Sequence, residues 1–458
     1  MPYHLAVDIG ASSGRCAAGW LKDGKFHTEE VHRFPNSIVN RNGSLCWNLE
    51  TLFNEIVTGL RKCHENGKTP QSIGIDTWAV DFVLLDENGA KLGDSISYRD
   101  KRTHGCDADV YKIISETELY NRTGIQKQLF NTIFQLRAVQ RDNPTLLERA
   151  RHFLMLPDYL HYKLCGIFSN EYTNATSTGL VNALKRDWDF EIINALNFPA
   201  RIFKPLTKPA TILGSLSHEI QKAVGFNCNV IAPVTHDTPS AIMAVPTQGA
   251  IYISSGTWSL MGIETDSPNC SEQARKLNFT NEGGFNNYCF RKNIMGLWLI
   301  QETKRELNCD LSFSELCSMA ENENISSIIN ANDSRFFSPE SMITEIRSAC
   351  KETGQEIPVT PGQFAKVIYS SLAKCYAETV KEIEILADRN FDIIHIVGGG
   401  ANADYLNRLI MEATGKTIRT NPVEAAIIGN ISAQMIACGE IKNLQEVRSY
   451  IKEYKHGF

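Results

Sequence analysis

Along the chain, short runs of apolar residues alternate with segments in which apolar residues recur at helical spacing. After Asn48, which would cap a helix, apolar residues recur at helical spacing from Leu49 to Leu60. Asp23-Gly24 and Asn88-Gly89 are hairpin signals between apolar runs. The pattern predicts strands over residues 4–10, 15–21, 25–33, 72–76 and 80–86.

The same order of elements returns in the second half of the chain. Small residues at 255–257 separate two apolar runs, and three glycines at 398–400 follow another. Strands are predicted over 249–254, 258–264 and 392–397, and helices from Pro361, over 402–414 and over 423–438. Alternating helices and strands predict an α/β protein. The recurrence predicts two domains of related architecture, residues 1–246 and 247–458, with a ligand in the cleft between them.

Composition narrows the classes of function. The chain has 458 residues and a net charge of −6, so a nucleic-acid partner is not expected. No apolar run reaches about 18 residues and no signal peptide precedes the first strand, so we expect a cytoplasmic protein with no membrane partner. The 13 cysteines are scattered without a CxxC pair, which predicts neither a zinc site nor a disulfide framework.

Three turns of small residues are candidates for binding phosphate. The first, Ala11-Ser12-Ser13-Gly14-Arg15, follows Asp8, which would hold Mg²⁺ through water. Ser254 to Thr257 occupies the matching place in the second half, and Gly398-Gly399-Gly400 would let a nucleotide approach bare backbone. Ordinary hairpin turns and a flexible loop are the alternative interpretations.

Two further segments carry candidate catalytic and sugar-binding chemistry. Asp237 stands between a predicted strand and a helix that begins near Pro239, where it would act as a general base for a hydroxyl. Capping of that helix by Asp237 or Thr238 is an equally ordinary use. Trp78, flanked by Asp76 and Asp81, would suit a polyol or sugar, or would be a core tryptophan.

Together these segments resemble the FGGY carbohydrate kinases, and within them the branch that phosphorylates rhamnulose. The stretches GASSGR (10–15), GIDTW (74–78) and KNIMGLW (292–298) are the most specific, and the likeness runs from residue 5 to about 430. The resemblance implies two actin-like (ribonuclease H-like) domains flanking a central nucleotide- and sugar-binding cleft. It also implies ATP, Mg²⁺ and transfer of phosphate to the 1-hydroxyl of L-rhamnulose, with no obligate protein partner.

The resemblance also assigns roles to residues. Asp237 would be the catalytic base. The sugar-binding positions would be Trp78, Ala79, His236, Asp237, Thr238 and Asn293. The nucleotide contacts would be Ala11, Ser12, Ser13, Gly14, Arg15, Thr257, Gln301, Gly398, Gly399 and Gly400.

The chain departs from this family pattern at Ala79, where relatives commonly carry glycine, so the ketose is the least defined part of the expectation. Some relatives have cysteine pairs in the second domain, but Cys350 has no cysteine in the next 20 residues, and no such bridge is expected. Alternatives are a kinase for L-fuculose or xylulose, an ATP-switched actin-like binding protein and a silent sugar sensor.

Overall fold

The computed structural model describes residues 1–308, 310–420 and 424–452, and its chain forms two compact units. The first unit comprises Met1–Pro246, Glu264–Phe290 and the described residues from Ala425 on. The second comprises Thr247–Ile263 and, as far as described, Arg291–Glu424. The functional boundary expected between residues 246 and 247 stays a prediction.

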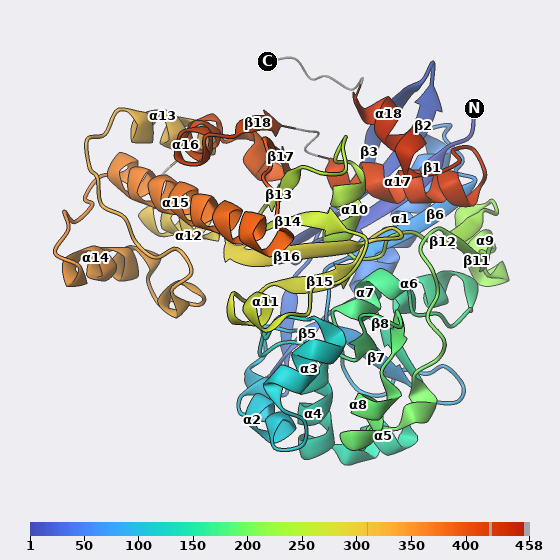
Figure 1. The fold of residues 1–458 in the computed structure, drawn as a ribbon. Helices are drawn as coiled ribbons and strands as arrows, with labels where there is room; N and C mark the ends of the chain where they lie inside the picture. Colours follow the sequence, from blue (N-terminus) through green and yellow to red (C-terminus); the bar gives the residue numbers. More distant parts are fainter. Residues whose placement is uncertain (309, 421–423, 453–458) are drawn as a thin grey trace. The chain divides into compact units, whose positions relative to one another are not determined.

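A six-stranded sheet forms the centre of the first unit (Figure 1). Parallel pairing joins β1 to β6 and β6 to β12, and the other neighbours are antiparallel. In sheet order the strands are β11 (Thr211–Ser215), β12 (Asn229–Ala232), β6 (Ser72–Thr77), β1 (His4–Ile9), β2 (Ser13–Lys22) and β3 (Lys25–Pro35).

Helices that pack on this sheet come from both ends of the chain. They are α1 (Leu49–Glu65), α6 (Leu156–Cys165), α10 (Asp237–Met243), α17 (Ala425–Ala437) and α18 (Leu444–Lys452), and α9 (His218–Val224) packs on α1. The first of them begins as predicted, since the Asn48 side chain accepts a hydrogen bond from Thr51 N. α17 is buried along most of its length, because its small and branched apolar residues lie on β1 and β6.

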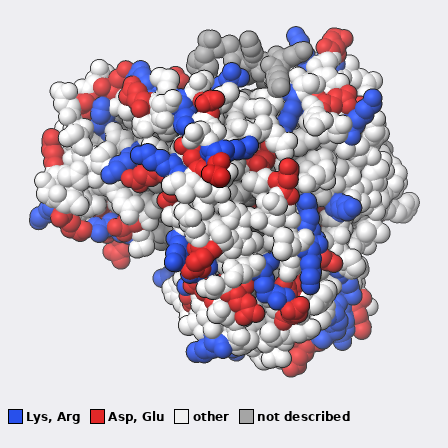
Figure 2. Space-filling model, viewed as in Figure 1, with Lys and Arg blue, Asp and Glu red and all other residues white. Residues whose placement is uncertain are grey.

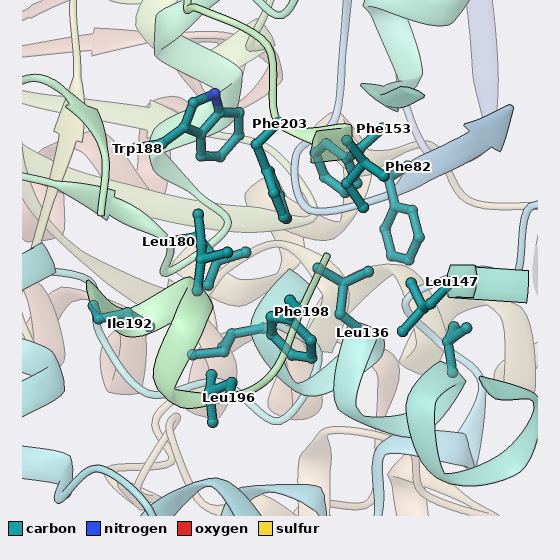
Figure 3. Packing of buried hydrophobic residues seen from close by; sticks show 14 of the residues in the cluster. Phe82, Leu136, Leu147, Phe153, Leu180, Trp188, Ile192, Leu196, Phe198 and Phe203 are labelled. Atoms are coloured by element: carbon teal, nitrogen blue, oxygen red, sulfur yellow. The ribbon is translucent and has the colours of Figure 1, made fainter. Parts of the chain in front are cut away.

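The first unit also contains a second apolar cluster (Figure 3). The rings of Phe82, Phe153, Trp188 and Phe203 meet at its centre. The remaining strands of the first unit are β4 (Ile38–Arg41), β5 (Ser44–Trp47), β7 (Phe82–Leu85), β8 (His152–Met155), β9 (Val181–Asn182), β10 (Asp187–Trp188) and β15 (Thr280–Gly283). Its remaining helices are α2 (Cys106–Tyr111), α3 (Glu116–Thr123), α4 (Thr132–Asp142), α5 (Pro144–Arg149), α7 (Tyr172–Thr176), α8 (Phe190–Ala195) and α11 (Glu272–Lys276).

The second unit repeats the central motif of the first. An antiparallel hairpin of β13 (Ile251–Ser255) and β14 (Trp258–Thr265) lies beside the parallel strand β17 (Ile393–Val397). The other strands are β16 (Tyr288–Met295) and β18 (Thr417–Thr420). The helices are α12 (Trp298–Leu307), α13 (Phe313–Glu321), α14 (Met342–Glu352), α15 (Pro361–Ala387) and α16 (Asp404–Thr414). The recurrence that the sequence predicted is therefore present.

Two further properties of the chain are visible in its described part. The cysteines there are all free. Every helix within residues 1–308, 310–420 and 424–452 is too short or too polar for a membrane span. On the face that Figure 2 shows, acidic and basic side chains are interspersed. Cys309 and the predicted helix start at Val423 lie outside the described residues.

Candidate active site

Two neighbouring parallel strands place a pair of aspartates side by side in the first unit. Asp8 on β1 and Asp76 on β6 are register partners. Asp76 is fully buried, and the Asn430 amide donates to its Oδ2 at 2.6 Å. Burial, reinforced by the charge of Asp8, raises the pKa of Asp76 well above its usual range. Among the described residues, Asp76 Oδ1 has no hydrogen-bond partner.

A third carboxylate, that of Asp237, lies in the segment after β12, close enough to Asp8 and Asp76 for their charges to interact. Thr77 N donates to Thr235 O at 2.9 Å, which aligns this segment with the end of β6. Asp237 is the first residue of α10, and its side chain is 32% exposed. Burial raises the pKa of Asp237, and the charge of Asp8 adds to that increase.

The residues on either side of Asp237 also face it. Thr238 Oγ1 donates to Asp237 Oδ1 at 3.1 Å, and His236 Nε2 lies 3.6 Å from the same oxygen. His236 Nδ1 lies 3.0 Å from Glu282 Oε2, so the ring stands between two carboxylates. No side-chain cap forms at the start of α10, which the structure describes in full. The N-cap residue is His236, so Asp237 and Thr238 lie inside the first turn of α10 and neither is its N-cap residue.

The buried side chain of Glu171 holds the loop that precedes α10 through hydrogen bonds to Thr235. Thr235 donates to Glu171 Oε2 through its backbone N–H at 3.1 Å and its hydroxyl at 2.7 Å. Asn174 Nδ2 donates to Thr235 O at 3.2 Å and to Trp78 O at 3.4 Å. Burial raises the pKa of Glu171. Through these contacts the residues around α7 connect the Asp237 segment to the Trp78 segment.

Trp78 is oriented by a second buried aspartate. Asp81 Oδ2 accepts from the indole N–H of Trp78 at 2.9 Å and from that of Trp47 at 2.6 Å. Gln135 Nε2 donates to Asp81 Oδ1 at 3.0 Å, and the two indole rings lie 4.2 Å apart. A carboxylate with partners on both oxygens and only 1% exposure holds the Trp78 ring in one position.

The backbone beside Trp78 is strained at Val80, not at Ala79. Val80 has a φ of +68°, a conformation that a β-branched residue rarely adopts. Thr132 Oγ1 donates to Val80 O at 2.6 Å, and Val80 N donates to Ser177 Oγ at 3.2 Å. Ala79 keeps a negative φ and is half-buried, so its methyl group is compatible with the local backbone. Strain of this kind concentrates at functional sites.

The first predicted phosphate turn is a tight connection between β1 and β2. Gly10 N donates to Ser13 O at 2.9 Å, and the Ser12 and Ser13 side chains are exposed while Ala11 is half-buried. A Cβ at Gly14 would lie 2.3 Å from the Phe34 ring, so packing alone requires this glycine.

Arg15 already has a partner within the same unit. Its Nε and Nη2 both donate to Asp8 Oδ2, at 3.0 and 2.9 Å. The two side chains are 17% and 14% exposed. In this state the guanidinium offsets the charge of Asp8, the residue that the sequence predicted to hold Mg²⁺ through water.

The predicted nucleotide residues of the second unit come together around the turn between β13 and β14. Thr257 Oγ1 donates to Gln301 Oε1 at 3.4 Å, and Trp298 N donates to Thr257 O at 3.1 Å. The start of α12 is thereby tied to this turn. The two residues that sequence placed 44 positions apart are direct neighbours.

The glycines after β17 lie against the same turn. Gly398 has a φ of +81°, and a Cβ there would lie 2.8 Å from Ser255 O. A Cβ at Gly400 would lie 2.0 Å from Ser255 Oγ, whereas one at Gly399 would meet nothing within 4 Å. Bare backbone is therefore needed at Gly398 and Gly400, and the exposed Gly399 leaves room above it.

Asn293, predicted to bind sugar, belongs to the second unit. It is half-buried on β16, and its Oδ1 accepts from Arg291 Nη1 at 3.0 Å. The other sugar positions, Trp78, Ala79 and His236 to Thr238, belong to the first unit. The predicted sugar residues are thus divided between the units.

The side chains present suit the two groups that the resemblance implies. Asp8, Asp76 and Asp237 supply only oxygen donors, the kind that Mg²⁺ prefers, and the unpaired Asp76 Oδ1 provides a further one. The hairpin turn with Gly398 and Gly400 against it presents backbone of the kind that holds phosphate groups.

Sequence reasoning missed the residues that hold these groups in place. Glu171, Asn430 and Glu282 each contact a site residue across more than 45 positions of sequence. No local motif marks such partners. Asp81 had a signal, since it stands three residues after Trp78 in a segment already singled out for its flanking carboxylates.

Known proteins match this chain over nearly its whole length. Residues 3–244 match the N-terminal domain, and residues 251–438 the C-terminal domain, of the FGGY family of carbohydrate kinases. A rhamnulokinase of Oceanobacillus iheyensis is 49% identical over 98% of this chain and 96% of its own. A rhamnulokinase of Bacillus subtilis is 42% identical over 98% of this chain and 93% of its own.

Solved structures show the same fold at low identity. A ligand-bound xylulose kinase from Lactobacillus acidophilus has a TM-score of 0.82 at 14% identity, covering 98% of this chain and 92% of its own. A glycerol kinase of Plasmodium falciparum with ADP has a TM-score of 0.78 at 13% identity, covering 99% and 92%. The predicted two-domain α/β fold is confirmed, and the chain belongs to the FGGY family of carbohydrate kinases.

Proposed function

We propose that the protein transfers the γ-phosphate of ATP to the 1-hydroxyl of L-rhamnulose, giving L-rhamnulose 1-phosphate and ADP. Relatives named rhamnulokinase that cover 97% or more of the chain, at 41–49% identity, support this substrate. The observation that carries the chemistry is Asp237, a partly exposed carboxylate at the start of α10 that Thr238 and His236 both face. The cytoplasm stays the predicted compartment.

Asp237 is the general base of the proposed reaction. The sugar O1 forms a bond to the γ-phosphorus while the bond from that phosphorus to the β,γ-bridging oxygen breaks, and ADP leaves. The O1 proton passes to Asp237 Oδ. Because an aspartate pKa of about 3.9 lies far below that of an alcohol, the transfer occurs late, and the raised pKa of Asp237 narrows the difference.

The ketose is held by residues beside this base. His236 and Thr238 flank Asp237 in sequence and in space. Trp78 is buried in the core and fixed by Asp81, and its place at the sugar site rests on the family likeness. We assign Ala79 and Asn293 to the same site on the strength of the family likeness. Polar groups converging beside an oriented aromatic ring suit a polyhydroxylated substrate.

The nucleotide is held by the phosphate turns. In the second unit these are Thr257 with Gln301, and the glycines 398–400, of which Gly398 and Gly400 lie against Ser255. In the first unit Ala11 to Arg15 contribute backbone N–H groups and the guanidinium. Asp8 would hold Mg²⁺ through water, with Asp76 nearby, and the ion when bound offsets the negative charge of the phosphates.

The alternative functions do not account for residues that this chain has. A binding protein switched by ATP has no use for a base beside an oriented tryptophan. A silent sensor has no use for the three neighbouring carboxylates of Asp8, Asp76 and Asp237. Kinases for L-fuculose or xylulose are the nearest rivals, since they need the same machinery.

The test is ADP release measured with ATP, Mg²⁺ and a panel of L-rhamnulose, L-fuculose, xylulose and aldoses. We expect kcat/KM to be highest for L-rhamnulose, and the product to carry phosphate on O1 by ³¹P–¹H correlation. A higher kcat/KM for another ketose would overturn the assignment, and ADP release that no sugar stimulates would overturn the kinase itself.

A further inference from the structure

Three metal-ligating side chains meet at the opposite end of β1 from Asp8. His4 begins the strand, and Cys438 and Glu440 follow the end of α17. Their ligand atoms all lie within 4.8 Å of one another, with His4 Nε2 3.0 Å from Glu440 Oε1. His4 is fully buried, Cys438 is half-buried, and the Glu440 side chain is 24% exposed. We call these three residues the His4 cluster.

A chain of buried hydrogen bonds determines which His4 nitrogen carries a proton. Leu5 O can only accept, so the Gln434 group that lies 3.0 Å from it is the Nε2 donor, and Gln434 Oε1 is an acceptor. Ser72 Oγ donates its one hydrogen to Gln434 Oε1 at 2.6 Å. His4 Nδ1, 2.7 Å from Ser72 Oγ, must then donate to that oxygen.

The His4 Nε2 lone pair consequently points at the other two members of the His4 cluster. A neutral imidazole has one N–H, and Nδ1 uses it. His4 Nε2 and Glu440 Oε1 lie 3.0 Å apart, and either a proton or a metal cation can occupy the position between them. Gln71 Nε2 lies 3.3 Å from His4 Nε2 and also donates to Glu440 Oε1, so this exposed side chain has to move aside when an ion binds.

We propose that the His4 cluster binds a divalent cation of the zinc type through His4 Nε2, Cys438 Sγ and the Glu440 carboxylate. Nitrogen, sulfur and oxygen are the donors that Zn²⁺ takes, and three protein ligands leave a fourth position for water. A ligating imidazole usually donates its other N–H to a partner that fixes its orientation, which is the arrangement of His4 with Ser72. Mg²⁺ and Ca²⁺ fit less well because only one ligand is a carboxylate.

Binding exchanges a proton for the metal at Cys438. A cysteine thiol has an ordinary pKa of about 8.5, so near neutral pH it is mostly S–H before metal binds. The S–H bond breaks as the sulfur–metal bond forms, and the proton leaves to solvent. The ion would join the start of β1 to the segment after α17.

This cluster is separate from the proposed kinase site. Asp8 lies four residues further along β1, about 13 Å at the usual rise of a strand. The sequence expectation of no zinc site came from cysteine spacing alone. It could not include a histidine 434 positions before the cysteine, because only the fold brings them together.

The experiment uses the full chain without an affinity tag, stripped with chelator and kept in excess Mg²⁺. Zn²⁺ is titrated by calorimetry, and Co²⁺ serves as the spectroscopic probe. We expect one equivalent of Zn²⁺, a rise in melting temperature, and a near-ultraviolet charge-transfer band from thiolate to Co²⁺. Cys438→Ser loses all three, whereas Cys165→Ser, which removes another half-buried cysteine, keeps them.

Two further variants guard the interpretation. Glu440→Gln changes a surface residue and must also lose stoichiometric Zn²⁺. Ser72→Ala removes the acceptor of His4 Nδ1–H and is expected to weaken binding by about 10–100-fold. Cys438→Ser should keep its turnover of L-rhamnulose, so loss of the metal and loss of the kinase are distinguishable. A wild type without the Co²⁺ band, or a Cys438→Ser variant that binds as tightly, overturns the proposal.

Discussion

Asp237 is the side chain on which the proposed transfer depends most directly. Asp237→Asn keeps an oxygen to accept from Thr238 but cannot take the sugar proton. We expect kcat to fall by about 10²–10⁴-fold with the melting temperature nearly unchanged. Steady-state kinetics and thermal unfolding test this. A folded variant with nearly normal turnover would remove Asp237 from the role of base.

The raised pKa of Asp237 has a definite sign in the pH profile. Below that pKa the carboxyl is protonated and cannot accept the proton of O1. The acidic limb of kcat/KM should therefore fall at a pH above the ordinary aspartate value of about 3.9. Profiles measured with the fold monitored by circular dichroism test this. A limb at or below the ordinary value contradicts it.

Ala79 is the residue where the chain departs from its family. Since its φ is negative, a methyl group costs no backbone strain, and Ala79→Gly should change the KM for L-rhamnulose by less than about tenfold. Ala79→Leu adds bulk and should impair use of the ketose far more. The KM for ATP should hardly change in either variant. If Ala79→Leu leaves ketose kinetics unaltered, position 79 does not line the sugar site.

At the scale of elements, the buried charge of Asp76 on β6, beside Asp8 on β1, lowers the stability of the folded chain. Because burial raises the pKa of Asp76, the folded state binds a proton more tightly than the unfolded chain does. Stability from this group is therefore greatest in acid and falls as pH rises from the unfolded pKa toward the folded one.

Asp76→Asn removes this cost while the new side chain can still accept from Asn430. We expect the melting temperature at neutral pH to rise by about 2–4 °C, the shift that roughly 1 kcal/mol produces. Turnover should fall at least about tenfold, because a carboxylate near the proposed metal is lost. A variant that is less stable and fully active would contradict both parts. Asp86→Asn, in a surface turn, is the matched control.

The contact of the glycine turn with the β13–β14 turn predicts a selective effect on nucleotide binding. Gly398→Ala forces a side chain into a backbone conformation (φ +81°, ψ −168°) that is essentially restricted to glycine, at about 1–3 kcal/mol, and toward Ser255 O. We expect a higher KM for ATP with little change for the ketose. Gly399→Ala, where a Cβ meets nothing, is the control. Equal effects of the two variants would refute this account.

Elements were predictable where one local rule decided them. Helix α15 begins at Pro361 after a Thr360 cap, and β17 ends at the glycines, as the sequence indicates. The roles assigned to site residues stay predictions, although the structure does bring Thr257 and Gln301 together. The strain at Val80 and the support from Glu171 and Asn430 were not predictable, because each depends on distant partners.

At the scale of the whole molecule, the residues proposed to bind ATP and sugar belong to two units. We therefore expect the two ligands to affect both the stability and the compactness of the protein. ATP and L-rhamnulose should each raise the melting temperature, since each binds only the folded chain. With a non-hydrolysable ATP analogue and sugar together, we expect a smaller radius of gyration by small-angle scattering. An unchanged radius of gyration at saturating ligand would count against a closing movement of the two units on ligand binding.

The position of α17 has a consequence for how the protein is made. Gln434 donates to Leu5 O, a partner 429 positions earlier, and Asn430 donates to Gly74 O and Asp76. The nascent chain exposes its first strands on the ribosome long before the helix that covers them is translated. Contacts so distant in sequence slow folding and leave apolar sheet open to aggregation. Chaperone assistance during synthesis, and insolubility of chains cut short before residue 425, are the expected results.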